Sequence, residues 1–154
     1  MATNPGDFYL GNPNLKKVGT QIDFTQDQIQ EYIKCKDDPV YFAKNYIKII
    51  SLDEGIVPFK MWDFQEELIT KFHENRFNIA KLPRQTGKST TCVSYLLHYA
   101  LFNDNVNIGI LANKLSTARD LLGRLQLAYE QLPLWLQQGI VVYNKGCLLY
   151  TSDA

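Results

Sequence analysis

The chain has 154 residues, of which 45% are hydrophobic and 21% charged, and this is the size and composition of one globular domain. Such a balance excludes a disordered, collagen-like or low-complexity chain, and no apolar run approaches the roughly 18 residues that span a bilayer. The first ten residues also lack the basic start and apolar stretch of a secretory signal. Three cysteines without CxxC spacing, Cys35, Cys92 and Cys147, argue against a disulfide framework or a zinc site and favour free thiols.

Charge is unevenly divided along the chain, although sixteen basic residues balance sixteen acidic ones. Residues 1–76 carry nine basic and twelve acidic side chains, whereas residues 77–154 carry seven basic and four acidic ones. The basic half suits an anionic ligand, and an ordinary protein surface explains the same imbalance. The overall neutrality excludes a globally basic nucleic-acid coat protein.

Local signals in the first 76 residues predict an irregular arm, three helices and one extended pair. Thr25 and Gln28 form a capping-box pattern at the start of the first helix. Asp38 followed by Pro39 is a second helix start, with an N-cap residue and a proline in the first turn. In chain order, we expect an arm over 1–24, helices over 26–34 and 39–49, two short extended pieces over 49–60 and a helix over 63–74.

The second half of the chain alternates strand and helix patterns. Residues 88–102 are apolar nearly all round, which predicts a buried helix, and residues 116–132 place apolar side chains at steps of three and four. The elements expected here are strands over 77–82, 106–112 and 139–143, helices over 88–102 and 116–132, and turns over 83–87 and 144–146. This order is typical of βαβ units, so we predict an α/β domain with a parallel sheet.

Gly87, Lys88, Ser89 and Thr90 lie between a predicted strand and a predicted helix, which is the setting of a phosphate-binding loop. The glycine lets backbone N–H groups turn toward a phosphate, and the helix N-terminus adds unpaired N–H groups and its dipole. Lys88 would reach the β and γ phosphates of ATP, and the Ser89 hydroxyl would bind Mg²⁺. The first glycine of the usual GxxxxGK[ST] pattern is missing, because Leu82 stands in its place. A chance helix start with solvated side chains therefore stays open as the alternative.

Two further side chains have both a functional and an ordinary interpretation. Arg84 lies inside the loop, where an arginine can place positive charge on the transferring γ-phosphate, and it can equally pair with a carboxylate or with solvent. Gln65 lies 23 residues before Lys88, and a glutamine amide can both donate to and accept from an adenine edge. Taken alone, Gln65 is better explained as an ordinary surface glutamine.

Together these residues resemble the large terminase subunits of tailed bacteriophages. Residues 82–90 (LPRQTGKST) look like the variant Walker A loop of that family, in which RQ-x-GK[ST] replaces the first glycine. Residues 38–47 (DPVYFAKNYI) and 62–68 (WDFQEEL) resemble its N-terminal region and its adenine-binding glutamine motif. Residues 108–122 and 132–146 are similar to the segments that follow the loop, so the match covers about residues 36–146.

The resemblance implies a partial RecA-like P-loop NTPase domain with a parallel sheet, preceded by a helical N-terminal region. The N-terminal region would cover residues 1–60, and the first part of the ATPase domain would cover residues 61–146. In this family assignment Gln65 reads adenine, Arg84 is an arginine finger acting in cis, Lys88 binds phosphate and Ser89 helps to hold Mg²⁺. The implied nucleotide-binding residues are Gln65, Arg84, Gln85, Thr86, Gly87, Lys88, Ser89 and Thr90, with Arg84 and Lys88 catalytic.

The resemblance also implies a motor that uses ATP to move double-stranded DNA into a preformed capsid. The family motor is a homo-oligomeric ring that works with a portal protein and a small terminase subunit, in the host cytoplasm at the procapsid portal, and a C-terminal nuclease domain cuts the DNA. Loop residues that would couple nucleotide state to movement are Asn113, Lys114 and Ser116, and candidate DNA contacts are Lys114, Arg119 and Arg124. Ordinary solvated surface explains both sets equally well.

Hydrolysis in such enzymes needs an acidic pair at the end of a later apolar strand, and this sequence contains no such strand. Asp53 and Glu54 precede the loop, and Asp153 stands alone. Residues 147–154 depart from the family, so we expect a truncated or non-native end and little or no ATP hydrolysis by this chain alone. Two alternatives stay open, namely a helicase-like or DNA-repair P-loop ATPase and a small non-catalytic nucleotide-binding module.

Overall fold

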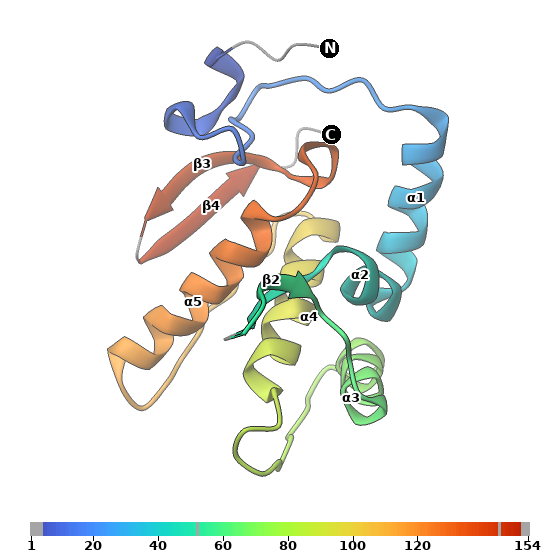
Figure 1. Cartoon of the computed structure of the whole chain (residues 1–154), viewed down its shortest axis with the longest axis vertical. Coiled ribbons are helices and arrows are strands. Elements are labelled where there is room, and N and C mark those ends of the chain that lie inside the picture. Colours follow the sequence, from blue (N-terminus) through green and yellow to red (C-terminus); the bar gives the residue numbers. More distant parts are fainter. Residues whose placement is uncertain (1–4, 52, 145, 152–154) are drawn as a thin grey trace.

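A computed structural model describes residues 5–51, 53–144 and 146–151, and helices dominate it (Figure 1). The helices are α1 Gln26–Asp37, α2 Pro39–Tyr46, α3 Asp63–Glu74, α4 Lys88–Phe102 and α5 Leu115–Glu130. The strands are β1 Lys48–Ser51, β2 Gly55–Pro58, β3 Gly139–Asn144 and β4 Cys147–Thr151, and short 3-10 turns cover Pro5–Asp7, Tyr9–Gly11 and Leu134–Leu136. No helix in the described ranges is long and apolar enough to cross a membrane.

The first two helices begin where their capping signals place them. At α1, the Thr25 hydroxyl accepts from the Gln28 backbone N–H at 3.2 Å, and the Gln28 side chain accepts from the Thr25 N–H at 3.0 Å. At α2, one carboxylate oxygen of Asp38 accepts from two backbone N–H groups at 2.8 and 2.9 Å, with Pro39 in the first turn. These bonds satisfy N–H groups that a helix cannot pair within itself. Both predicted starts are confirmed, and α1 runs three residues beyond its predicted end.

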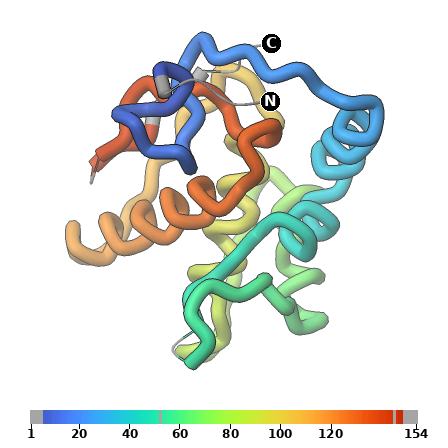
Figure 2. Tube along the Cα trace, turned by 45° about the horizontal axis from the view of Figure 1, so that its top comes forward, coloured from blue at the N-terminus to red at the C-terminus, as the bar shows by residue number. Residues whose placement is uncertain are grey.

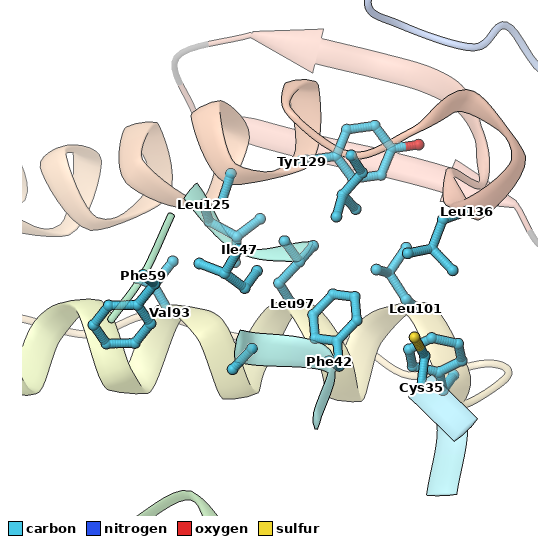
Figure 3. Close-up of a cluster of buried hydrophobic side chains, with 14 of the residues drawn as sticks. Cys35, Phe42, Ile47, Phe59, Val93, Leu97, Leu101, Leu125, Tyr129 and Leu136 are labelled. Atoms are coloured by element: carbon cyan, nitrogen blue, oxygen red, sulfur yellow. The ribbon is translucent and has the colours of Figure 1, made fainter. Parts of the chain in front are cut away.

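Helix α4 lies at the centre of the molecule, in contact with α2, α3 and α5 (Figure 1). Figure 3 shows that Val93, Leu97 and Leu101 of α4 share a cluster with Leu125 and Tyr129 of α5. The same core includes Leu15, Cys35, Phe42, Ala43, Ile47, Phe59, Ile69, Phe102, Ala128, Leu132, Leu136 and Ile140. The predicted burial of 88–102 is therefore confirmed. The core draws on residues from both sides of the predicted boundary at 60/61, and the division into two regions stays a prediction.

The predicted parallel sheet, and with it the RecA-like fold class, is wrong. The structure contains two small antiparallel sheets, β1 with β2 (Lys48 opposite Pro58) and β3 with β4 (Gly139 opposite Thr151), and the described residues form no parallel sheet. The expected extended pieces over 49–60 exist as the two strands of one hairpin. The expected strand over 139–143 exists as one strand of the other hairpin. An antiparallel pair needs only a short turn, whereas a parallel pair needs partners brought together by a crossover.

The expected strands over 77–82 and 106–112 are also wrong. Both segments lack helix and strand hydrogen bonding among the described residues. Phe77, Ile79 and Leu111 are 83%, 101% and 95% exposed, so these apolar side chains face solvent. The apolar pattern is present, but a strand is stable only when a neighbour pairs with its backbone groups. With no partner strand in the described structure, the segments remain extended and unpaired.

The N-terminal arm packs beside the C-terminal hairpin, far away in sequence (Figure 2). The Ile140 N–H donates to the Lys16 carbonyl at 2.9 Å, and the Val18 N–H donates to the Ile140 carbonyl at 3.2 Å. The buried Gln137 side chain donates to the Asn14 carbonyl at 2.9 Å and accepts from the Lys16 N–H at 3.0 Å. Over residues 5–24 the arm is thus irregular apart from two short 3-10 turns, as predicted. Hydrogen bonds to residues distant in the sequence hold it in place.

The described chain ends in β4, which occupies most of the segment predicted to be truncated or non-native. Residues 147–151 pair with β3, while residues 152–154, including Asp153, lie outside the described residues. In the turn expected over 144–146, the Asn144 side chain accepts from the Gly146 N–H at 2.8 Å, and residue 145 lies outside the described part. The origin of residues 147–154 stays a prediction.

Candidate functional site

The loop over 83–87 turns the chain from the extended segment 77–82 into α4. Gly87 is the N-cap residue of α4 and has a left-handed backbone, with φ of 70°. An L side chain rarely adopts this conformation, and a Cβ at Gly87 would lie 2.6 Å from Nε2 of Gln65. Gln85 shares the left-handed region at φ 63°. The predicted turn and the predicted helix start at Lys88 are both confirmed.

Lys88 folds back over its own loop. Its ammonium Nζ donates to the Pro83 carbonyl at 2.9 Å, and the Thr86 hydroxyl donates to the same oxygen at 3.0 Å. The described residues supply no carboxylate partner for Lys88 within 4 Å. The ammonium is therefore held at the mouth of the loop by a neutral acceptor.

The first turn of α4 offers backbone donors beside this ammonium. In the described part of the chain, no acceptor bonds the N–H groups of Lys88, Ser89 and Thr90, whereas the Thr91 N–H already donates to the Gly87 carbonyl at 3.0 Å. The first turn of α4 contains no acidic residue. Free N–H groups and the helix dipole make such a terminus favourable for an anion.

Gln65 joins α3 to the loop across a 21-residue separation. Its side chain is 4% exposed, its Oε1 accepts from the Trp62 N–H at 3.0 Å, and its Nε2 donates to the Thr86 carbonyl at 3.2 Å. The structure thus brings Gln65 together with the loop. The adenine-reading role that the family resemblance implies for Gln65 stays a prediction.

The remaining predicted binding residues lie along the loop and the start of α4. Arg84 and Gln85 are exposed, whereas Thr86, Ser89 and Thr90 are half-buried. The roles of Arg84 as arginine finger and of Ser89 as magnesium ligand stay predictions.

Thr91 is a part of the site that sequence reasoning missed. It is completely buried, and its hydroxyl donates to the Gly87 carbonyl at 3.2 Å, so it fastens the first turn of α4 to the N-cap residue. The available signal was the helical step of four residues from Gly87, which places Thr91 above that carbonyl.

Two ionisable groups on α4 are held in their neutral forms by burial. Burial raises the pKa of the Cys92 thiol, although the nearby Lys88 charge lowers it, so this cysteine is no ready nucleophile. Burial lowers the pKa of His98 to about 4, and its Nε2 lies 2.8 Å from the Cys35 carbonyl. His98 is therefore a buried, hydrogen-bonded residue of the core.

The described residues contain no group of three or more His, Cys, Asp or Glu side chains that could hold a metal ion. The expectation of little or no ATP hydrolysis stays a prediction. Asp53 and Glu54 are exposed in the turn between β1 and β2. Asn113 and Lys114, which precede α5, are exposed as well. Ser116, expected in the loop, lies in the first turn of α5 and is exposed, as are Arg119 and Arg124 of the same helix. The roles of these residues in coupling or DNA contact stay predictions.

A comparison with protein-family models found none that matches this chain. The resemblance to large terminase subunits therefore rests on the residues quoted for it.

Proposed function

We propose that this chain binds ATP with Mg²⁺ through the loop over 83–90 at the start of α4. The observation that carries the proposal is the Lys88 ammonium, held 2.9 Å from the Pro83 carbonyl of its own loop beside unpaired N–H groups. A charged phosphate oxygen is a stronger acceptor for an ammonium than a neutral carbonyl. A triphosphate entering the loop would replace that carbonyl at little cost.

Each loop residue then has a defined task. Gly87 turns the backbone into α4, Lys88 would neutralise charge on the β and γ phosphates, and the Ser89 hydroxyl would be the protein ligand for Mg²⁺. Arg84 is exposed and within the same turn, so it is the side chain available to approach the γ-phosphate. Backbone groups of Gln85, Thr86 and Thr90 complete the phosphate cradle.

We further propose that the bound nucleotide serves a DNA-packaging motor of the large terminase kind. The support is the combined resemblance of residues 36–146 to that family and the geometry of the loop. In this proposal the full motor acts as a homo-oligomeric ring on double-stranded DNA, with a portal protein and a small terminase subunit, at the procapsid portal in the host cytoplasm. Because the sequence contains no apolar strand after the loop that ends in an acidic pair, we expect this chain to bind ATP and turn it over very slowly.

The test is a calorimetric titration of the chain with Mg·ATP. We expect Lys88→Ala to weaken binding by about tenfold to a hundredfold, because a hydrogen bond to a charged group contributes about 1.5–3 kcal/mol. The control is Lys81→Ala, which removes the same charge from an exposed position in the extended segment and should leave affinity unchanged. Equal affinities of Lys88→Ala and the unaltered chain would refute the proposal.

A further inference from the structure

We infer that Gln65 is a positioning residue, which holds the phosphate loop in its binding conformation through the Thr86–Gly87 peptide. The inference rests on the proposed nucleotide binding and assigns Gln65 a different task from reading adenine. The Gln65 side chain is 4% exposed, and both of its polar atoms are already bonded to backbone, Oε1 to the Trp62 N–H and Nε2 to the Thr86 carbonyl.

The bond to Thr86 fixes the orientation of one peptide plane in the loop. A trans peptide is planar, with its C=O and N–H pointing to opposite sides. With the Thr86 carbonyl held toward Gln65, the N–H of Gly87 is directed away from α3. The peptide that Gln65 hydrogen-bonds is the one immediately before Gly87, the left-handed N-cap residue of α4.

Close packing between Gln65 and Gly87 adds to the restraint that the hydrogen bond to Thr86 provides. The position of a Cβ on Gly87 lies 2.6 Å from Nε2 of Gln65, so the amide rests directly against the glycine backbone. A rotation of the Thr86–Gly87 peptide would break the bond at Thr86 and bring backbone against the amide. The loop and the side chain therefore restrict each other.

Gln65 can act in this way because its own helix is anchored. Its backbone N–H donates to the Trp62 carbonyl at 2.8 Å, which closes the first turn of α3. The adjacent Glu66 pairs with Lys44 of α2 at 2.8 Å, and Ile69 one turn later is completely buried. Because α3 is fixed and both polar atoms of the Gln65 side chain are hydrogen-bonded, the Thr86 carbonyl has little freedom to move.

The two roles of Gln65 make different predictions about the ligand. Reading an adenine edge uses the amide oxygen and nitrogen together, and here both are engaged by backbone. A residue that acts through the loop affects every ligand carrying the triphosphate, whatever its base. Inorganic tripolyphosphate, which has no base, separates the two roles.

The experiment compares the unaltered chain with Gln65→Met, a replacement of similar length without hydrogen bonds, in titrations with Mg·ATP, Mg·GTP and magnesium tripolyphosphate. We expect the same loss, about tenfold, for all three ligands. Gln30→Met on the exposed side of α1 is the matched control and should cause no loss. A loss confined to Mg·ATP, or no loss at all, would overturn the positioning role. If the unaltered chain binds none of the three ligands, it is the proposed nucleotide binding that fails.

A second variant gives a pH signature that altered packing alone would not produce. In Gln65→Glu, a neutral carboxyl can donate to the Thr86 carbonyl and a carboxylate cannot, and burial beside a carbonyl favours the neutral form. We expect the tripolyphosphate affinity of Gln65→Glu, divided by that of the unaltered chain at the same pH, to recover at least fivefold between pH 8 and pH 5. A ratio that stays constant across this range contradicts the inference, and circular dichroism at both pH values verifies that the variant is folded.

Discussion

Helix α4 and the extended segments that flank it, 77–82 and 106–112, are all rich in apolar residues, yet only α4 is buried. Val93, Leu97 and Leu101 of α4 lie in the core, whereas Ile79 and Leu111 in the two segments face solvent. A helix pairs its backbone groups within itself, so it needs only an apolar face to pack. An extended segment needs a second segment at its edge. The same apolar content therefore has different consequences in the two backbone conformations.

We expect the largest effect from a substitution that disrupts the packing of α4. Leu97 is completely buried, so Leu97→Ala should leave a cavity and lower the free energy of unfolding by about 4 kcal/mol. The measurement is urea unfolding followed by circular dichroism. Leu111→Ala is the same replacement at a 95% exposed position and should change stability by less than about 0.5 kcal/mol. Similar losses in the two variants would show that 106–112 is packed in solution and would contradict the comparison.

A pH titration sharpens the same comparison at His98, the ionisable side chain among those that α4 buries. His98 has a pKa lowered to about 4 by burial, against 6.5 for the unfolded side chain. The unfolded chain therefore binds the proton first, and stability that is fully present above pH 6.5 is lost as the pH falls toward 4, by about 3 kcal/mol. Hydrogen bonds from Tyr41 and Tyr46 lower the pKa of Glu31, so its contribution is lost only below about pH 4.5.

The control for this titration is His98→Gln, whose amide can still donate to the Cys35 carbonyl but does not titrate. Its stability should be nearly constant between pH 6.5 and 4.5. His73→Gln, at an exposed position, should retain most of the dependence of the unaltered chain, because the charge of His73 lowers the pKa of His98 less than burial does. A pH dependence that survives in His98→Gln would assign the effect to other groups.

The features predictable from sequence are those whose hydrogen bonds are local. The capping box at Thr25, the N-cap at Asp38 and the helix start at Lys88 each depend on residues within four positions, and all three are present. Two bonds within the loop over 83–87 are nearly as local, because they join the Pro83 carbonyl to Thr86 and Lys88, three and five positions later.

The features that sequence reasoning missed depend on partners distant in the chain. Gln137 anchors the N-terminal arm from more than 120 positions away, and no periodicity marks it. Within the site, the motif predicted that Gln65 and the loop belong together, but not that the amide bonds the Thr86 carbonyl. The prediction of a parallel sheet was wrong for the same reason. An alternation of apolar residues indicates a strand, but it does not indicate which other strand pairs with it.

The substitution with the smallest expected effect is the most direct test of whether segment 77–82 is exposed in solution. Ile79 is fully exposed, so Ile79→Ser removes no buried apolar area and should change the free energy of unfolding by less than about 0.5 kcal/mol. Ile69→Ser, the same replacement at a completely buried position of α3, should cost several times more, because it removes core packing and buries a hydroxyl. Urea unfolding at two protein concentrations measures both. A loss above 1 kcal/mol for Ile79→Ser would mean that segment 77–82 is covered in solution, and a loss that grows with concentration would identify the cover as a second copy of the chain. A negligible loss at both concentrations would instead establish that the apolar alternation of 77–82 contributes nothing to the stability of this fold.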